Sequence, residues 1–211
     1  MKRAAKLSLL CLGCMMLVTA VPAFSQFIEY HNILAGGDFS TPPPTTYPTS
    51  NAWWEAPPGI WEVEGQVEGD IVVLNSYMAM GGQHNITNTV LLPVYLGQYF
   101  RPDLDLTFNY QIASDETGCS YDKVDVSVVQ FNSFIGGTPT NQWHLETIPL
   151  CTNTNTQNGW QSKSYDFATY PALQGVNWPV FSTIYIAVVV TTDSSVTSTF
   201  KLDNVELWAP K

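Results

Sequence analysis

Basic residues are scarce in this chain of 211 residues. It has 8 Lys and Arg residues against 18 Asp and Glu residues, and Lys2, Arg3 and Lys6 lie in the first six positions. Removing these three leaves five basic against 18 acidic residues, a net charge of −13. Nucleic acid and anionic membrane surfaces both need Lys and Arg, so we expect neither as a partner. The acidic excess fits a soluble extracellular protein whose carboxylates bind hard cations such as calcium.

Enzyme motifs are absent as well. The sequence has no Gly-x-Ser-x-Gly, His-Glu-x-x-His or Walker loop. Its three histidines, His31, His84 and His144, form no pair at metal-ligand spacing. We therefore expect a protein that is not an enzyme. A small secreted hydrolase stays open as an alternative, because a glycosidase needs only two carboxylates.

Cysteines are few, and half of them lie near the N-terminus. Cys11 and Cys14 fall in a segment with the features of a signal peptide, which leaves Cys119 and Cys151 as an even pair. Such a pair in an oxidising compartment predicts a disulfide. For a closed loop of this length, the disulfide would stabilise the folded state by about 3–4 kcal/mol. Two free thiols are the alternative.

The N-terminal segment has the three parts of a secretory signal. Basic residues precede an apolar run over residues 7–20, and Ala23-Phe24-Ser25 fits a cleavage site before Gln26. The run of about 14 residues is short for a membrane span of roughly 20, and no second run spans a membrane. Lipidation at Cys14 is an alternative that would hold the protein at the cell surface. We predict a signal peptide over residues 1–25 and one domain over residues 26–211 of a secreted protein.

No stretch of the mature chain keeps a helical apolar period, whereas strand patterns recur. Leu104, Leu106, Phe108, Tyr110 and Ile112 alternate with polar residues, as in a strand with one buried face. Residues 183–191 are apolar on both faces, as in a central strand. About ten short strands separated by turn residues predict an all-β fold, an antiparallel two-sheet β-sandwich.

Three details of the strands are expected from local sequence. In the strand over residues 199–208, the odd step from Leu202 to Val205 would flip the buried face, so we predict a β-bulge at Asp203-Asn204. We expect one strand over residues 71–78, broken by Met80-Gly81-Gly82. Another strand over residues 86–92 is expected to end at Pro93.

The order of several short segments resembles the galactose-binding-like jelly-roll superfamily, which includes many carbohydrate-binding modules and is similar in plan to adhesive MAM-type domains. The matching segments are 32–34, 37–39, Trp61, 80–82, 89–93, 106–112, 122–126, 159–161 and 198–207. The resemblance implies a jelly-roll sandwich, often with a structural calcium where the first and last strands meet. It assigns Asp38 and Asp203 as candidate ligands, although Ser40 stands where the family usually has glutamate.

Aromatic and acidic loops supply the other candidate sites. Tryptophan and tyrosine rings stack on sugar rings, so Trp53, Trp54, Tyr77 and Trp143 are candidate ligand-binding residues, with core packing as the alternative. The polar neighbours of this platform would be Asn75, Gln83 or Gln142. We expect Trp61, Trp160 and Trp208 to be mainly structural, because they lie in strand patterns.

The polar loop over residues 114–122 is the second candidate cation site. Asp115, Glu116 and Asp122 offer the oxygen ligands that calcium prefers, although their spacing fits no EF-hand. The alternative is a solvated acidic turn.

Together these features predict a secreted, non-catalytic recognition domain that binds carbohydrate through loop aromatics. The alternative is a structural or adhesive extracellular protein that binds protein partners or itself through the apolar Trp53-Trp54 segment.

Overall fold

The computed structural model describes residues 30–34, 37–39, 62–65, 71–74, 77–83, 85–96, 103–131, 139–156, 159–178 and 182–210. The predicted signal peptide, Ser40, Trp53, Trp54, Trp61 and Asn75 lie outside the described residues. No helix in the described part is long and apolar enough to cross a membrane.

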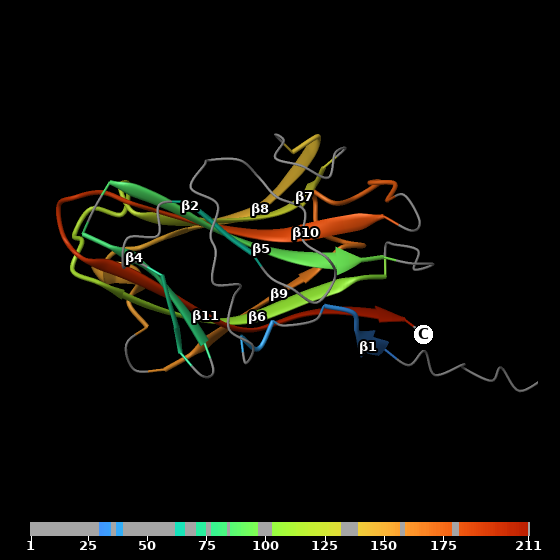
Figure 1. The fold of residues 1–211 in the computed structure, drawn as a ribbon, viewed down its shortest axis with the longest axis horizontal. Helices are drawn as coiled ribbons and strands as arrows, with labels where there is room; N and C mark the ends of the chain where they lie inside the picture. The colour runs from blue at the N-terminus through green and yellow to red at the C-terminus, as the bar shows by residue number, and fades with distance from the viewer. Residues whose placement is uncertain are drawn as a thin grey trace, which may run out of the picture.

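Eleven strands of the described chain form two antiparallel sheets, which lie one above the other in Figure 1. The six-stranded sheet has the order β3-β4-β11-β6-β9, with β1 paired to β11, and the five-stranded sheet has the order β2-β5-β10-β7-β8. The first sheet contains β1 (Tyr30–Asn32), β3 (Ile71–Leu74), β4 (Tyr77–Gly82), β6 (Asp105–Ser114), β9 (Gln161–Asp166) and β11 (Ser198–Pro210). The second contains β2 (Glu62–Gly65), β5 (Ile86–Tyr95), β7 (Lys123–Gln130), β8 (Asn141–Pro149) and β10 (Thr183–Thr192). The predicted all-β, two-sheet sandwich is confirmed.

The core lies between the sheets and follows the predicted alternation. Leu106, Phe108 and Ile112 of β6 are buried and Tyr110 packs against the core, whereas Thr107, Asn109 and Gln111 are half-exposed on the outer face. In β10 both faces are buried: Ile184 and its partners join the main core, and Tyr185 joins a second cluster with Leu91, Val129, Phe131 and Ala187. The prediction of a central strand covered on both faces is therefore confirmed.

The bulge in the last strand is also confirmed. The pairing of β11 with β6 shifts register between Asp203 and Glu206, and Asn204 has a positive φ of 48°. An asparagine tolerates this left-handed conformation better than most residues. The bulge restores the inward face, so that Leu202 and Val205 are both buried.

Two strand boundaries were predicted wrongly. Residues 71–78 form parts of two strands, β3 and β4, which pair with Leu74 opposite Tyr77. Gly81 continues β4 with φ 112°, and a Cβ there would lie 2.2 Å from Ser198 O, so glycine permits close pairing instead of ending the strand. Likewise β5 runs through Pro93 to Tyr95, because Pro93 lies beyond Asn88–Leu91, where β5 pairs with β2.

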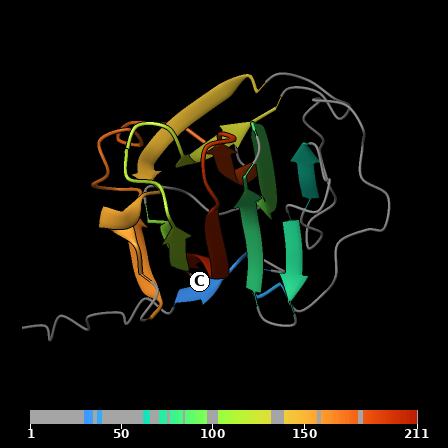
Figure 2. The ribbon, with the colours of Figure 1, turned by 90° about the vertical axis from the view of Figure 1, so that its left-hand side faces the viewer.

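The strand order brings three loops to one end of the sandwich. β6 and β7 belong to different sheets, so residues 115–122 cross between the layers. This loop lies with the loop after β8 and with the loop from β10 to β11, at the end opposite β1 and the C-terminus (Figure 1). Figure 2 views the molecule from that side. We call the segments 115–122, 150–156, 159–160 and 193–197 the stapled end, because the disulfide described next joins two of them.

Candidate functional site

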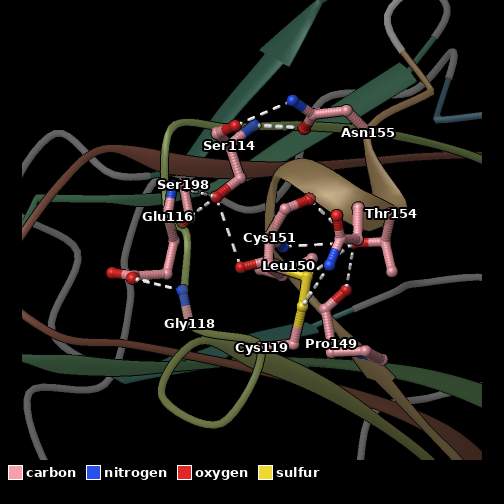
Figure 3. The surroundings of a disulfide bond; sticks show 11 residues. Ser114, Glu116, Gly118, Cys119, Pro149, Leu150, Cys151, Thr154, Asn155 and Ser198 are labelled. Atoms are coloured by element: carbon pink, nitrogen blue, oxygen red, sulfur yellow. Dashed lines mark hydrogen bonds between the residues drawn. A yellow bond between two sulfur atoms is a disulfide. The ribbon is translucent and has the colours of Figure 1, made fainter.

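The predicted disulfide between Cys119 and Cys151 is confirmed, and it joins two loops 32 residues apart in the sequence (Figure 3). Backbone hydrogen bonds reinforce the junction. The N–H of Leu150 donates to Asp122 O at 2.9 Å, and that of Thr152 donates to Glu116 O at 2.7 Å. Segments 115–122 and 150–156 therefore form one connected unit.

Side chains of the loop after β8 make the hydrogen bonds that a neighbouring strand would otherwise make at the end of β6. Asn155 accepts from Ser114 N at 2.7 Å through Oδ1 and donates to Ser114 O at 2.8 Å through Nδ2 (Figure 3). Thr156 Oγ1 accepts from Ile112 N at 2.7 Å. The ladder between β6 and β9 ends at the pair Tyr110 and Gln161, so these contacts satisfy the backbone beyond it. The loop is thereby held against the sheet.

A polar cleft of about 420 Å³ lies on this loop. Its lining is rich in amide and hydroxyl side chains: Asn153, Thr154, Asn155, Thr156, Gly159 and Gln161. Amide side chains both donate and accept hydrogen bonds, so this lining suits a ligand with many hydroxyl groups.

An aromatic pair includes Trp160, which stands between the cleft-lining residues Gly159 and Gln161 in the chain. Trp160, which directly precedes Gln161, is 41% exposed, and its ring meets that of Tyr77 edge-on with centroids 5.7 Å apart. Lys201 Nζ lies 5.3 Å from the centre of the Tyr77 ring and donates to Gln111 Oε1 at 3.0 Å. Gln111 and Lys201 alternate with buried residues of β6 and β11, so the pair lies over the outer face of the six-stranded sheet.

The structure separates the residues predicted to form one aromatic platform. Tyr77 lies in this outer-face pair, whereas Trp143 is a half-buried residue of β8 whose ring is 4.5 Å from that of Trp178. Gln83 and Gln142 are both exposed, but Gln83 follows β4 of the six-stranded sheet and Gln142 lies in β8 of the five-stranded sheet. Trp53 and Trp54 lie outside the described residues.

Trp160 was expected to be structural, and its exposure corrects that expectation. The alternation of side chains in the sequence could have predicted that Trp160 is exposed. Tyr165 is the buried residue of β9, and Trp160 is an odd number of positions away from it, which places Trp160 on the opposite face.

The three acidic residues of the loop 115–122 do not all lie together either. Glu116 and Asp122 come together with Asp193 of the β10–β11 loop, and one carboxylate oxygen of each lies within 4.8 Å of the others. Asp115 is exposed and does not belong to this group. Sequence reasoning missed Asp193, because it lies 71 residues from Asp122 and only the strand order brings the two loops together.

Hydrogen-bond donors stabilise the charged form of two of these carboxylates. The backbone N–H of Gly118 and the Ser195 hydroxyl lower the pKa of Glu116. The Ser195 hydroxyl and backbone N–H lower the pKa of Asp193. Asp122 accepts the N–H of Asp193 at 2.8 Å through Oδ1.

Asp38 and Asp203, the candidate calcium ligands implied by the family resemblance, lie near the bulge of β11. Both oxygens of Asp203 accept hydrogen bonds from Asn204, and the exposed Asp38 lies next to Gly37, whose carbonyl accepts Val205 N–H at 2.9 Å. Burial, followed by the charge of Asp38, raises the pKa of Asp203. Calcium at this position stays a prediction.

Comparison with solved structures bears on the fold. The carbohydrate-binding module TmCBM61, solved with β-1,4-galactotriose, superposes with a TM-score of 0.51 and 13% identity over 84% of this chain and 97% of that one. A CBM4 module gives a TM-score of 0.45 at 14% identity, over 84% of this chain and 99% of that one. The enzymatically active domain of tailspike protein 4 from bacteriophage CBA120 gives 0.46 at 11% identity, over 85% of this chain and 21% of that one.

No protein-family model and no curated protein matches the sequence. At these low identities the likeness to solved structures is one of fold. The described chain has the β-sandwich fold found in carbohydrate-binding modules, as its resemblance to that superfamily predicted.

Proposed function

We propose that this chain is a secreted, non-catalytic domain that binds carbohydrate on the outer face of the six-stranded sheet. The observation that carries the proposal is the exposed ring of Trp160, which meets Tyr77 beside an amide-lined cleft. The C–H faces of a sugar ring stack on aromatic rings, while its hydroxyls need polar partners. Both requirements are met at adjacent positions of one chain segment.

The polar groups around the aromatic pair extend the same surface. Ser162 donates to Asn109 Oδ1 at 2.7 Å across β9 and β6, and Gln111 lies further along the same face. The ligand we expect is a neutral glycan, since the net charge of −13 left after the signal peptide would repel uronic or sulfated sugars. The fold of TmCBM61, which was solved with a galactose oligomer, supports this class of ligand by analogy.

The test compares two exposed aromatic residues on different sheets. Neutral polysaccharides and a glycan array are screened with the protein, and the affinity of each ligand found is measured by calorimetry. We expect Trp160→Ala to weaken binding at least about tenfold, because it removes the stacking ring. Tyr95→Ala removes a ring that is 45% exposed on β5, and it should leave the affinity unchanged.

Three results would count against the proposal. One is the absence of binding to any neutral glycan, and another is equal binding by Trp160→Ala and the parent protein. Release of new reducing ends from a bound polysaccharide would show that the domain is a hydrolase and overturn the non-catalytic assignment.

A further inference from the structure

We propose that Glu116, Asp122 and Asp193 form a calcium site that joins the β6–β7 loop to the β10–β11 loop. One carboxylate oxygen of each lies within 4.8 Å of the others, although the residues come from separate segments of the chain. Glu116 is 7% exposed, Asp122 is fully buried and Asp193 is half-buried. This site is independent of the proposed glycan site and rests on other residues.

The strongest sign of a missing ligand is a buried oxygen of Asp122. Oδ1 accepts the Asp193 N–H, but Oδ2 is buried and has no hydrogen-bond partner among the described residues. A buried carboxylate oxygen without a donor destabilises the fold, because its hydrogen bonds to water are lost and no protein group replaces them. A cation held among the three carboxylates would satisfy it.

The hydroxyl of Ser195 leaves a second contact unsatisfied. Its Oγ lies 2.7 Å from Glu116 Oε2 and 2.5 Å from Asp193 Oδ1. A serine hydroxyl carries one proton, so it can donate to only one of the two carboxylates at a time. The other contact then places two lone pairs face to face, an arrangement that a nearby cation stabilises.

No basic side chain of the described chain neutralises these three charges through an ion pair. The two ion pairs found there join Lys123 to Asp125 and Lys163 to Glu146. Two buried carboxylates beside a third would repel one another strongly in a site of low dielectric constant. A divalent ion offsets most of that repulsion.

The number of carboxylates favours calcium over magnesium, because magnesium is usually bound through only one or two carboxylates and keeps several waters. Calcium binds oxygen at about 2.3–2.6 Å, so ligands on opposite sides of the ion are up to about 5 Å apart. Magnesium binds at about 2.0–2.1 Å and needs opposite ligands about 4 Å apart. Oxygens within 4.8 Å of one another are compatible with the wider span of calcium.

The test uses calcium chloride and magnesium chloride as separate probes on chelator-treated protein. We expect calorimetry to show a calcium ion bound per chain, with weaker binding of magnesium. Because the ion binds only the folded state, the midpoint of thermal unfolding should rise on the order of 5–10 °C at a calcium concentration about 100 times Kd.

Asp122→Asn is the decisive variant, since it keeps the shape of the side chain but removes its charge. Calcium affinity should fall at least about tenfold. In chelator the variant should unfold no earlier than the parent protein, because one repelling charge is gone. A role of Asp122 in structure alone would instead lower the unfolding midpoint equally with and without calcium, and that result would overturn the proposal.

Matched variants keep the test decisive. Asp115→Asn, in the same loop but exposed, should leave the calcium response intact. If Asp122→Asn does not fold, Asp193→Asn serves the same purpose at a half-buried position. Loss of the response in Asp203→Asn and its retention in Asp122→Asn or Asp193→Asn would place the ion near the β11 bulge and overturn the proposal, as would a protein with no response to calcium.

Discussion

At the stapled end of the sandwich, a disulfide and side-chain hydrogen bonds join three loops from both sheets. At the other end, which we call the terminal end, β1 and residues 37–39 close the sheet against residues 205–210 of β11. There the contacts are mainly backbone pairs, such as Ile33 N to Leu207 O at 2.8 Å and Val205 N to Gly37 O at 2.9 Å. One end is built by cross-links between loops, and the other by close approach of two backbones.

The pKa shifts of the carboxylates also differ between the two ends. At the stapled end, donors from Gly118 and Ser195 lower the pKa of Glu116, and Ser195 lowers that of Asp193. At the terminal end, burial and then the neighbouring Asp166 raise the pKa of Asp105, which pairs with Trp208. Charged carboxylates are therefore stabilised where loops are cross-linked and disfavoured where the strands end.

Removal of the disulfide should change the relative stability of the two ends more than the glycine and carboxylate substitutions that follow. Cys119→Ser with Cys151→Ser opens a loop of 32 residues, and the chain-entropy model predicts a loss of about 3–4 kcal/mol in the free energy of unfolding. Urea unfolding measures the total loss, and hydrogen exchange locates it. We expect protection to fall first in segments 115–122 and 150–156, while the pairing of β1 with β11 keeps its protection. Equal loss at both ends would show that the ends are not stabilised separately.

Gly37→Ala is the corresponding change at the terminal end. A Cβ at Gly37 would lie 1.8 Å from Val205 O, a backbone atom that cannot move aside without opening the bulge. We expect a loss of about 2–3 kcal/mol in the free energy of unfolding, measured by urea denaturation.

Gly159→Ala is the control for this glycine, since no atom lies within 4 Å of its Cβ position. Its effect should stay below about 0.5 kcal/mol. A similar loss in both variants would mean that the contact with Val205 is not the cause, because the lower chain entropy of alanine in the unfolded state would by itself stabilise both variants.

The pH dependence of two carboxylate variants should show the smallest effect, with opposite signs. Asp105 has a pKa raised from 3.8, so its ionisation opposes folding, and Asp105→Asn should gain stability over the parent as the pH rises through 3.8 and through the higher pKa of the folded state. Glu146 lies outside the acidic cluster. Burial opposes its ionisation, but hydrogen bonds from Lys163 and Tyr165 outweigh burial and lower its pKa from 4.5.

The charge of Glu146 therefore stabilises the fold above pH 4.5, and this contribution is lost as the pH falls through its lower folded pKa. Glu146→Gln should be less stable than the parent at neutral pH, with the difference shrinking in acid. Urea unfolding between pH 3 and 7 measures both variants, and each effect should be below about 1 kcal/mol, because the side chains are partly exposed. If the stability differences of the two variants from the parent changed with pH in the same direction, hydrogen-bond donors would not explain why the pKa of Glu146 is lowered and that of Asp105 is raised.

Local sequence predicted the strands well where side chains alternate. The pattern of Leu106, Phe108 and Ile112 placed β6, and the odd step from Leu202 to Val205 placed the bulge, because burial alternates with a period of two along any strand. The same reasoning failed at Gly81 and Pro93. There the outcome depends on which backbone lies alongside, and local sequence does not contain that information.

The candidate sites show the same division. The sequence by itself determined which segments are strands and which face of β6 and β11 is buried, since these follow from local periodicity. It predicted Cys151 as the partner of Cys119 from the small number of cysteines, and the structure contains that bond. Only the tertiary structure decided that Trp160 meets Tyr77 and that Asp193, in place of Asp115, joins Glu116 and Asp122. The physical reason is that strand order in the two sheets sets which loops meet, and contacts between distant loops leave no periodic signal along the chain.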